Sequence, residues 1–157
     1  MRAVDAPIDQ SARMASWRDS ASQQAQDDRD GLLNAALPFA TQQLDKSGEF
    51  FPYGAALNVA GESRMVAADP NQGDHPESTA VLQAMIDGLR RERDDLRAVA
   101  LVADVRVSDG DAVRVELEHR EGHALAVLLP YKRKRFGRGI EYGSLTAGAA
   151  SSQIWSA

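Results

Sequence analysis

The sequence contains no cysteine, and that absence excludes several kinds of site. Without thiols the chain can form no disulfide, no cysteine-ligated zinc centre and no thiolate nucleophile. A chain of 157 residues can bury roughly 70% of the surface that its unfolded form exposes, so it needs no covalent crosslink to fold. The absence of cysteine fits a reducing compartment, and we expect the protein to be cytoplasmic.

Long apolar stretches are also missing. No run approaches the ~20 apolar residues that a membrane helix needs, and residues 1–17 lack the apolar core of a signal peptide. Hydrophobic residues make up 43% of the chain and charged residues 26%, which are the proportions of an ordinary globular domain. We therefore expect one folded domain and no membrane partner.

Motifs for nucleotide, calcium or hydrolase sites are absent as well. The chain has no Walker A loop, no GxGxxG fingerprint, no EF-hand loop and no GxSxG elbow. His75 has Asp74, Glu77 and Ser78 beside it, but neighbours in one loop are poorly placed to form a hydrolytic triad. A helix start explains the same residues, with Asp74 as the cap and Glu77 in the first turn. We predict neither a catalytic residue nor a cofactor.

The other two histidines, His119 and His123, enclose the sequence HREGH. On a helix this spacing would suit zinc, but here it crosses an expected hairpin turn. Glu116 and Glu118 should point to the face opposite His119, because side chains alternate along a strand. A metal site needs three or four converging ligands, so we predict solvent-exposed hairpin histidines and no metal.

Two segments have the apolar periodicity of an amphipathic helix. The first begins near Asp30 and ends at Gly48, a residue type suited to helix ends. Pro38 lies inside it and predicts either a kink or the start of another helix. The second begins near Pro76 and ends at about Arg93. The apolar stripes are Leu33, Leu37, Ala40 and Leu44 in the first helix, and Val81, Leu82, Met85, Ile86 and Leu89 in the second.

The other segments have the pattern of strands separated by short turns. Residues 112–119 alternate apolar and charged side chains, as expected of a strand with one buried face. Residues 123–129 are almost continuously apolar, which is typical of a strand buried on both faces. The expected strands are 53–59, 62–68, 97–107, 112–119, 123–129 and 140–146.

Tight turns join most neighbouring strands, so the sheet should be mainly antiparallel. We predict an α+β fold, residues 29–157, in which two main helices pack on one face of a single sheet of five to six strands. The polar residues 1–28 form a leader that is loosely attached or disordered. Phe50 and Phe51, between the first helix and the first strand, should fill the seam between helix and sheet.

Two resemblances follow from these segments. The order helix, two strands, helix, then further strands is similar to that of roadblock/profilin-like domains, which implies an antiparallel sheet that carries helices and often dimerises. The sequences LPFATQQLDKSGEFFPYGAAL, HPES and RVELEHREG resemble small bacterial proteins of unassigned activity, over residues 29–157. Neither resemblance implies a catalytic residue.

The sharpest charge feature is a basic segment, residues 131–138, in a chain whose net charge is −5. One interpretation is a loop that binds phosphate or nucleic acid, with an aromatic ring stacked on a base. Another is a solvated hairpin loop whose charges discourage edge pairing, or which meets the acidic surface of a neighbouring subunit. The candidate binding residues are Tyr131, Lys132, Arg133, Lys134, Arg135, Phe136 and Arg138.

These features favour a non-catalytic, cytoplasmic protein-interaction module that self-associates as a homodimer. It would bury an exposed apolar strand or helix surface against its partner, with the basic segment at the rim. An immunity-type protein that blocks a toxin is a variant of the same class. The alternative from another class is binding of nucleic acid or a phosphate ligand through residues 131–138.

Overall fold

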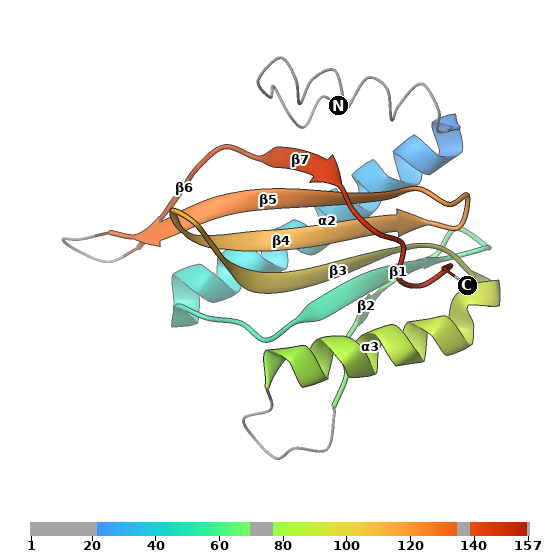
Figure 1. Ribbon diagram of the computed structural model, residues 1–157, viewed down its shortest axis with the longest axis horizontal. Coiled ribbons are helices and arrows are strands. Elements are labelled where there is room, and N and C mark those ends of the chain that lie inside the picture. The colour runs from blue at the N-terminus through green and yellow to red at the C-terminus, as the bar shows by residue number, and fades with distance from the viewer. Residues whose placement is uncertain (1–21, 70–76, 135–138, 157) are drawn as a thin grey trace.

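The computed structural model describes residues 22–69, 77–134 and 139–156. Within these ranges the chain forms two α-helices, one short 3-10 helix and a single seven-stranded sheet (Figure 1). Every strand pair is antiparallel. The expected α+β class with an antiparallel sheet is confirmed, and the sheet has one strand more than the largest number we expected.

The first helix, α2 (Gln23–Ser47), has a capping residue at each end. The Ser22 side chain accepts a hydrogen bond from the N–H of Ala25 at 3.0 Å. Gly48 ends the helix in the left-handed conformation, with φ of 77°, and its N–H donates to the carbonyl of Leu44 at 2.9 Å. The stop at Gly48 was therefore predicted correctly.

The start of α2 and its continuity differ from the prediction. The helix begins seven residues before Asp30 and runs through Pro38 as one element. Its first turns bury Asp28 and Arg29. Because both residues are charged, they add nothing to the apolar periodicity from which the start of the helix was predicted. Residues 22–28 therefore belong to the folded body, and residues 1–21 of the expected leader lie outside the described residues.

The strand order is β2-β1-β3-β4-β5, and both β6 and β7 pair with β5. The strand expected over residues 140–146 is thus two strands, which pair with opposite ends of β5. Between them the N–H of Gly143 donates to the carbonyl of Pro130 at 2.7 Å. The strands are β1 (Tyr53–Asn58), β2 (Ser63–Val66), β3 (Leu96–Val107), β4 (Gly110–His119), β5 (Ala124–Arg133), β6 (Ile140–Tyr142) and β7 (Thr146–Ala149).

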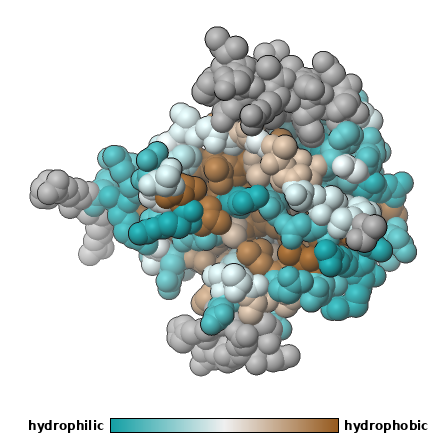
Figure 2. All heavy atoms as spheres, in the orientation of Figure 1, coloured by the Kyte–Doolittle hydropathy of each residue, from teal (hydrophilic) through white to brown (hydrophobic). Residues whose placement is uncertain are grey.

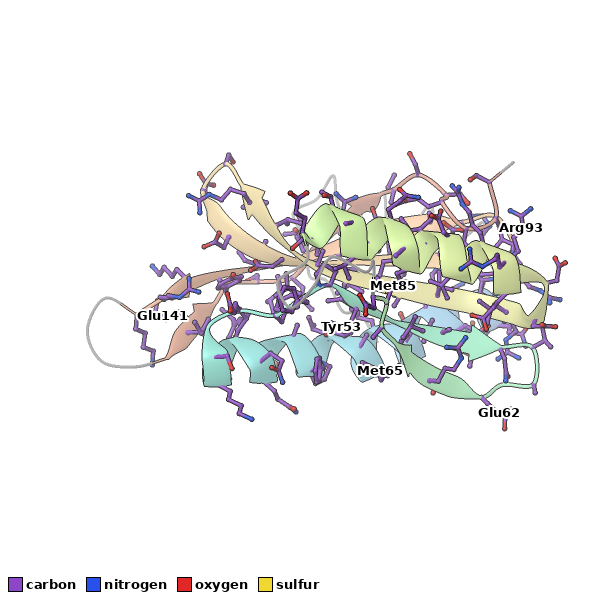
Figure 3. All side chains as sticks on the ribbon, turned by 90° about the horizontal axis from the view of Figure 1, so that it is seen from below. Tyr53, Glu62, Met65, Met85, Arg93 and Glu141 are labelled. Atoms are coloured by element: carbon purple, nitrogen blue, oxygen red, sulfur yellow. The ribbon has the colours of Figure 1, made fainter. Side chains whose placement is uncertain are left out.

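The two helices cover opposite faces of the sheet, although the sequence predicted both on one face (Figure 3). Helix α2 packs on the face that carries Ala55, and α3 (Ser78–Glu92) packs on the face that carries Ala56. Consecutive residues of a strand point to opposite faces, and β1 and β3 are apolar at consecutive positions. Both faces of these strands need cover, which is why the one-sided arrangement was wrong.

Helix α3 begins at Ser78, where Glu77 holds the N-cap position without a side-chain capping bond. The expected cap, Asp74 or His75, and Pro76 lie outside the described residues. The short 3-10 helix Arg93–Asp95 follows α3 and leads into β3. Within the described ranges, neither α2 nor α3 is both long and apolar enough to cross a membrane.

Strand β5 is buried on one face only, which corrects the prediction for residues 123–129. Leu125, Val127 and Leu129 pack in the core under α2, while Ala126 and Leu128 are half-buried on the other face. Helix α3 contacts β1 and β3 and does not extend over β5. Figure 2 looks onto this α3 side of the sheet and shows apolar side chains in patches divided by hydrophilic ones.

The two phenylalanines after α2 have different surroundings. Phe50 packs against the core, with its ring edge-to-face on Tyr53 at a centroid distance of 5.8 Å. Phe51 is 50% exposed. The expected filling of the helix–sheet seam holds for Phe50 and is wrong for Phe51.

Candidate protein-interaction surface

Tyr131, the first residue of the basic segment, lies in the core under α2. Its hydroxyl donates a hydrogen bond to Asp104 at 2.7 Å. Burial, followed by this bond to the carboxylate, raises the pKa of Tyr131 well above its usual range. Burial also raises the pKa of Asp104, while the hydrogen bond from Tyr131 acts in the opposite direction. The buried ring is not positioned to stack on a base.

Three cations of the basic segment lie at the end of β5 with exposed side chains: Lys132, Arg133 and Lys134. Lys132 Nζ is 3.7 Å from a carboxylate oxygen of Glu141 on β6. Arg133 donates to the carbonyl of Gly48, which places its charge at the end of α2 that the helix dipole makes negative. The other candidates, Arg135, Phe136 and Arg138, lie outside the described residues.

His119 is fully buried, so the prediction of a solvent-exposed hairpin histidine is wrong for it. Its Nε2 lies 2.8 Å from Asp28 Oδ2, and Arg97 donates two hydrogen bonds to the same carboxylate, each 2.9 Å long. His119 Nδ1 accepts from the N–H of Glu121 at 3.2 Å. Because Nδ1 is an acceptor, we assign the proton to Nε2, which donates to Asp28.

This arrangement gives His119 a structural role. Both ring nitrogens have partners within the protein, and the ring is buried. The Asp28 carboxylate joins α2 to β3 and β4 through Arg97 and His119. Among the described residues, no group of three acidic or histidine side chains could hold a metal ion.

Strand β2 forms one edge of the sheet in the described part of the chain. β2 is the last strand on its side of the sheet, and within the described residues it pairs only with β1. The N–H of Asn58 donates to the carbonyl of Glu62 at 2.9 Å, which marks this pair as hydrogen-bonded. Bonded pairs alternate along an antiparallel ladder, so the backbone groups of Ser63 and Met65 point away from β1.

Exposed apolar side chains lie beside this edge. Met65 is 49% exposed and pairs with Ala55, which places it on the α2 side of the sheet (Figure 3). Phe39 of α2 is 42% exposed and contacts Tyr53 of β1, with ring centroids 4.9 Å apart. We call the following set the edge surface: Phe39, Met65 and the free backbone of β2.

The only charged side chain within β2 is engaged on the other face. Arg64 donates to Glu92 of α3 at 2.8 Å, and both side chains are about half exposed. Charged or proline residues on an edge strand normally discourage pairing with another chain. Here the charge points to the α3 side, and the α2 side of the edge presents Met65.

Neither Phe39 nor Met65 was predicted as part of an interaction surface. Phe39 follows Pro38 and lies outside the apolar stripe of its helix, and that displacement is a signal of an exposed aromatic residue. Met65 gave no such signal, because its segment was expected to pair as an ordinary strand. No protein-family model, curated protein or solved structure matches the chain.

Proposed function

We propose that the protein is a non-catalytic protein-interaction module of the cytoplasm that forms a homodimer through the edge surface. The observation that carries this proposal is the free edge of β2, with Met65 half exposed beside it. An unpaired strand offers a row of donors and acceptors that an antiparallel copy of itself can satisfy. Phe39, which contacts Tyr53 of the neighbouring strand β1, adds apolar area on the same side of the sheet.

The side chains favour one register for this pairing. Centring the two-fold axis on Met65 pairs the two methionines and sets each Arg64 opposite Val66 of the second copy. Centring it on Arg64 would set two like charges face to face, which is unfavourable. Centring it on Ser63 would place Met65 opposite Gly61, without an apolar partner.

The alternative function, binding of phosphate or nucleic acid through residues 131–138, has weaker support. Tyr131 is buried, and Arg133 is engaged with the end of α2. Lys132 and Lys134 remain as exposed cations on the described part of the segment. Two exposed lysines are a small electrostatic footprint for a polyanion.

The mass in solution tests the homodimer. Light scattering at micromolar to ~100 µM concentration should give twice the chain mass of 17.0 kDa. Met65→Lys should give a monomer, because it places a charge at the axis of the pairing. The matched control is Val59→Lys, since Val59 is also 49% exposed but lies in the β1–β2 turn. A monomeric wild-type protein, or a dimer that survives Met65→Lys, would contradict the proposal.

Because the chain has no cysteine, one introduced cysteine reports the register without ambiguity. Met65→Cys should crosslink to itself with a short bismaleimide, and Val59→Cys should not. Arg64→Cys should crosslink less efficiently than Met65→Cys if the axis passes through residue 65. The reverse order would place the axis at Arg64 and overturn the register.

A further inference from the structure

Residues 152–156, which we call the strap, lie against the α3 side of the sheet and are held through their backbone. The carboxylate of Glu118 on β4 accepts hydrogen bonds from three consecutive N–H groups, those of Gln153, Ile154 and Trp155. The last two bonds are each 2.8 Å long. Glu118 is only 5% exposed, so these donors replace the water that its charge would otherwise need.

The carbonyls of the strap are bound from the opposite side. Arg90 of α3 donates to the carbonyl of Gln153 at 2.6 Å. Arg93, just after α3, donates to the carbonyl of Ile154 at 3.0 Å. Glu118, Arg90 and Arg93 therefore form a backbone-binding site, which we call the groove. It holds a bent backbone, because residues 153–155 are bends whose three consecutive N–H groups converge on one carboxylate.

One side chain of the strap is recognised by shape. Ile154 is fully buried in the apolar cluster between α3 and the sheet, with Met85, Leu89 and Val99 among its members. Trp155 packs at the edge of this cluster and is partly buried. The groove thus selects an aliphatic residue followed by an aromatic one, on a backbone that supplies three donors.

A hollow of about 180 Å³ lies beside the strap. Three polar side chains also line it: Arg114, Glu116 and Gln153 of the strap. Gln153 donates to Glu116 at 2.6 Å, and Arg114 donates to Glu116 at 2.7 Å. An apolar cavity of about 150 Å³ can hold a ligand as large as benzene. The apolar lining is formed by Leu82, Ile86, Leu101, Ala103 and Val105.

We propose that this groove is a peptide-binding site for a segment of another protein that adopts the same bend, and that the strap is its occupant in the free chain. The segment would carry an aliphatic residue at the position of Ile154, an aromatic one after it, and an apolar residue at the position of Gln153. That last side chain would enter the hollow, which the polar Gln153 only borders. The foreign segment would therefore bury apolar surface that the strap does not, and could displace it.

Fluorescence anisotropy of labelled peptides on the full chain tests the site. The probe ASSLIWS has the sequence of residues 150–156 with leucine in place of Gln153, and ASSQIWS is its matched control. The leucine probe should bind about fivefold more tightly, as burial of a few methyl and methylene groups allows. Ile154→Asp in the protein should strengthen binding of either probe about tenfold, because its own strap no longer competes. Adding Glu118→Gln should remove most of that gain.

Circular dichroism establishes whether Ile154→Asp and its double mutant remain folded. Folded Ile154→Asp protein that binds neither probe would overturn the proposal.

If the Ile154→Asp variant unfolds, the decisive variant is Gln153→Leu, which keeps every backbone contact of the strap. It should raise the melting temperature and slow hydrogen exchange of the amides of residues 153–155. Gln83→Leu, on the exposed face of α3, is the control and should do neither. If Gln153→Leu does neither, the hollow accepts no apolar side chain at this position and the proposal is overturned. The site is independent of the homodimer, because Met65 lies on the other side of the sheet.

Discussion

Asp28 connects α2 to the sheet through a buried polar network. Its carboxylate is buried and shared between the guanidinium of Arg97 and the imidazole of His119. Removing one partner of a buried ionic group leaves the others without compensation, and the cost is commonly ~3–5 kcal/mol. Replacing the whole group by apolar residues would cost far less, so the penalty belongs to the broken network.

Asp28→Asn should therefore lower the free energy of unfolding by about 3 kcal/mol in urea denaturation. The amide keeps the shape of the side chain but cannot neutralise Arg97. The neighbouring Asp27→Asn is the control, because Asp27 is exposed and accepts a hydrogen bond from Gln23 in the same helix, at 2.8 Å. It should change stability by less than ~0.5 kcal/mol. Equal effects of the two variants would show that the network contributes little.

This network also shows what residue patterns cannot predict. Asp28 and His119 are 91 residues apart, and their contact depends on α2 crossing the sheet at the β4–β5 turn. A sequence pattern reports periodicity within a segment and carries no information about which polar residues of distant segments meet. His119 was therefore predicted as solvent-exposed, although the turn that follows it was located correctly.

At the scale of elements, local chemistry predicted most of what formed. The apolar stripe of α3, the alternation of β4 and the stop at Gly48 all depend on residues within one element. The face of the sheet on which each helix packs depends on which faces of distant strands are apolar and must be buried. The prediction that both helices pack on one face was therefore wrong. The split between β6 and β7 was missed for a similar reason, since the two strands pair with different parts of β5.

Replacement by alanine should change stability in opposite directions at two glycines, one just after the end of α2 and one inside it. Gly48→Ala should destabilise the fold by about 1 kcal/mol, because a left-handed backbone costs that much for a residue with a Cβ. The added Cβ would also lie 3.4 Å from the Arg133 guanidinium. Gly31→Ala should stabilise it by up to about 1 kcal/mol, since Gly31 is in the helix interior with nothing within 4 Å of an added Cβ. Thermal denaturation measures both, and changes of the same sign would contradict this account of the helix end.

At the scale of the whole molecule, the two proposed surfaces are compatible. The edge surface lies at the β2 side of the sheet, and the strap lies over β4 on the α3 face (Figure 1). Pairing of two β2 strands would continue the sheet from one copy into the next without covering Glu118 or Ile154. A homodimer would thus carry two peptide sites, one in each copy, with their occupancy independent of the pairing.

Net charge then predicts how the homodimer responds to salt. Each copy carries a formal charge of −5, so the two copies repel each other at long range. Backbone hydrogen bonds and the contact between two methionines are not weakened by screening, whereas the repulsion is screened over roughly 10 Å at 0.1 M salt. The dimer dissociation constant should therefore fall a few-fold between about 50 and 500 mM salt. Sedimentation equilibrium at the two concentrations measures it.

The alternative function, binding of nucleic acid, predicts that affinity for the ligand falls as the salt concentration rises. An oligonucleotide bound through the basic segment would lose affinity steeply over the same range, because binding releases counterions from the phosphates. Anisotropy of a labelled single strand, measured in the same buffers, provides that comparison. A dimer that weakens steeply with salt would show that ion pairs hold the two copies together. The interface would then lie elsewhere than the apolar edge of β2, and the basic residues at the end of β5 would be the first place to look for it.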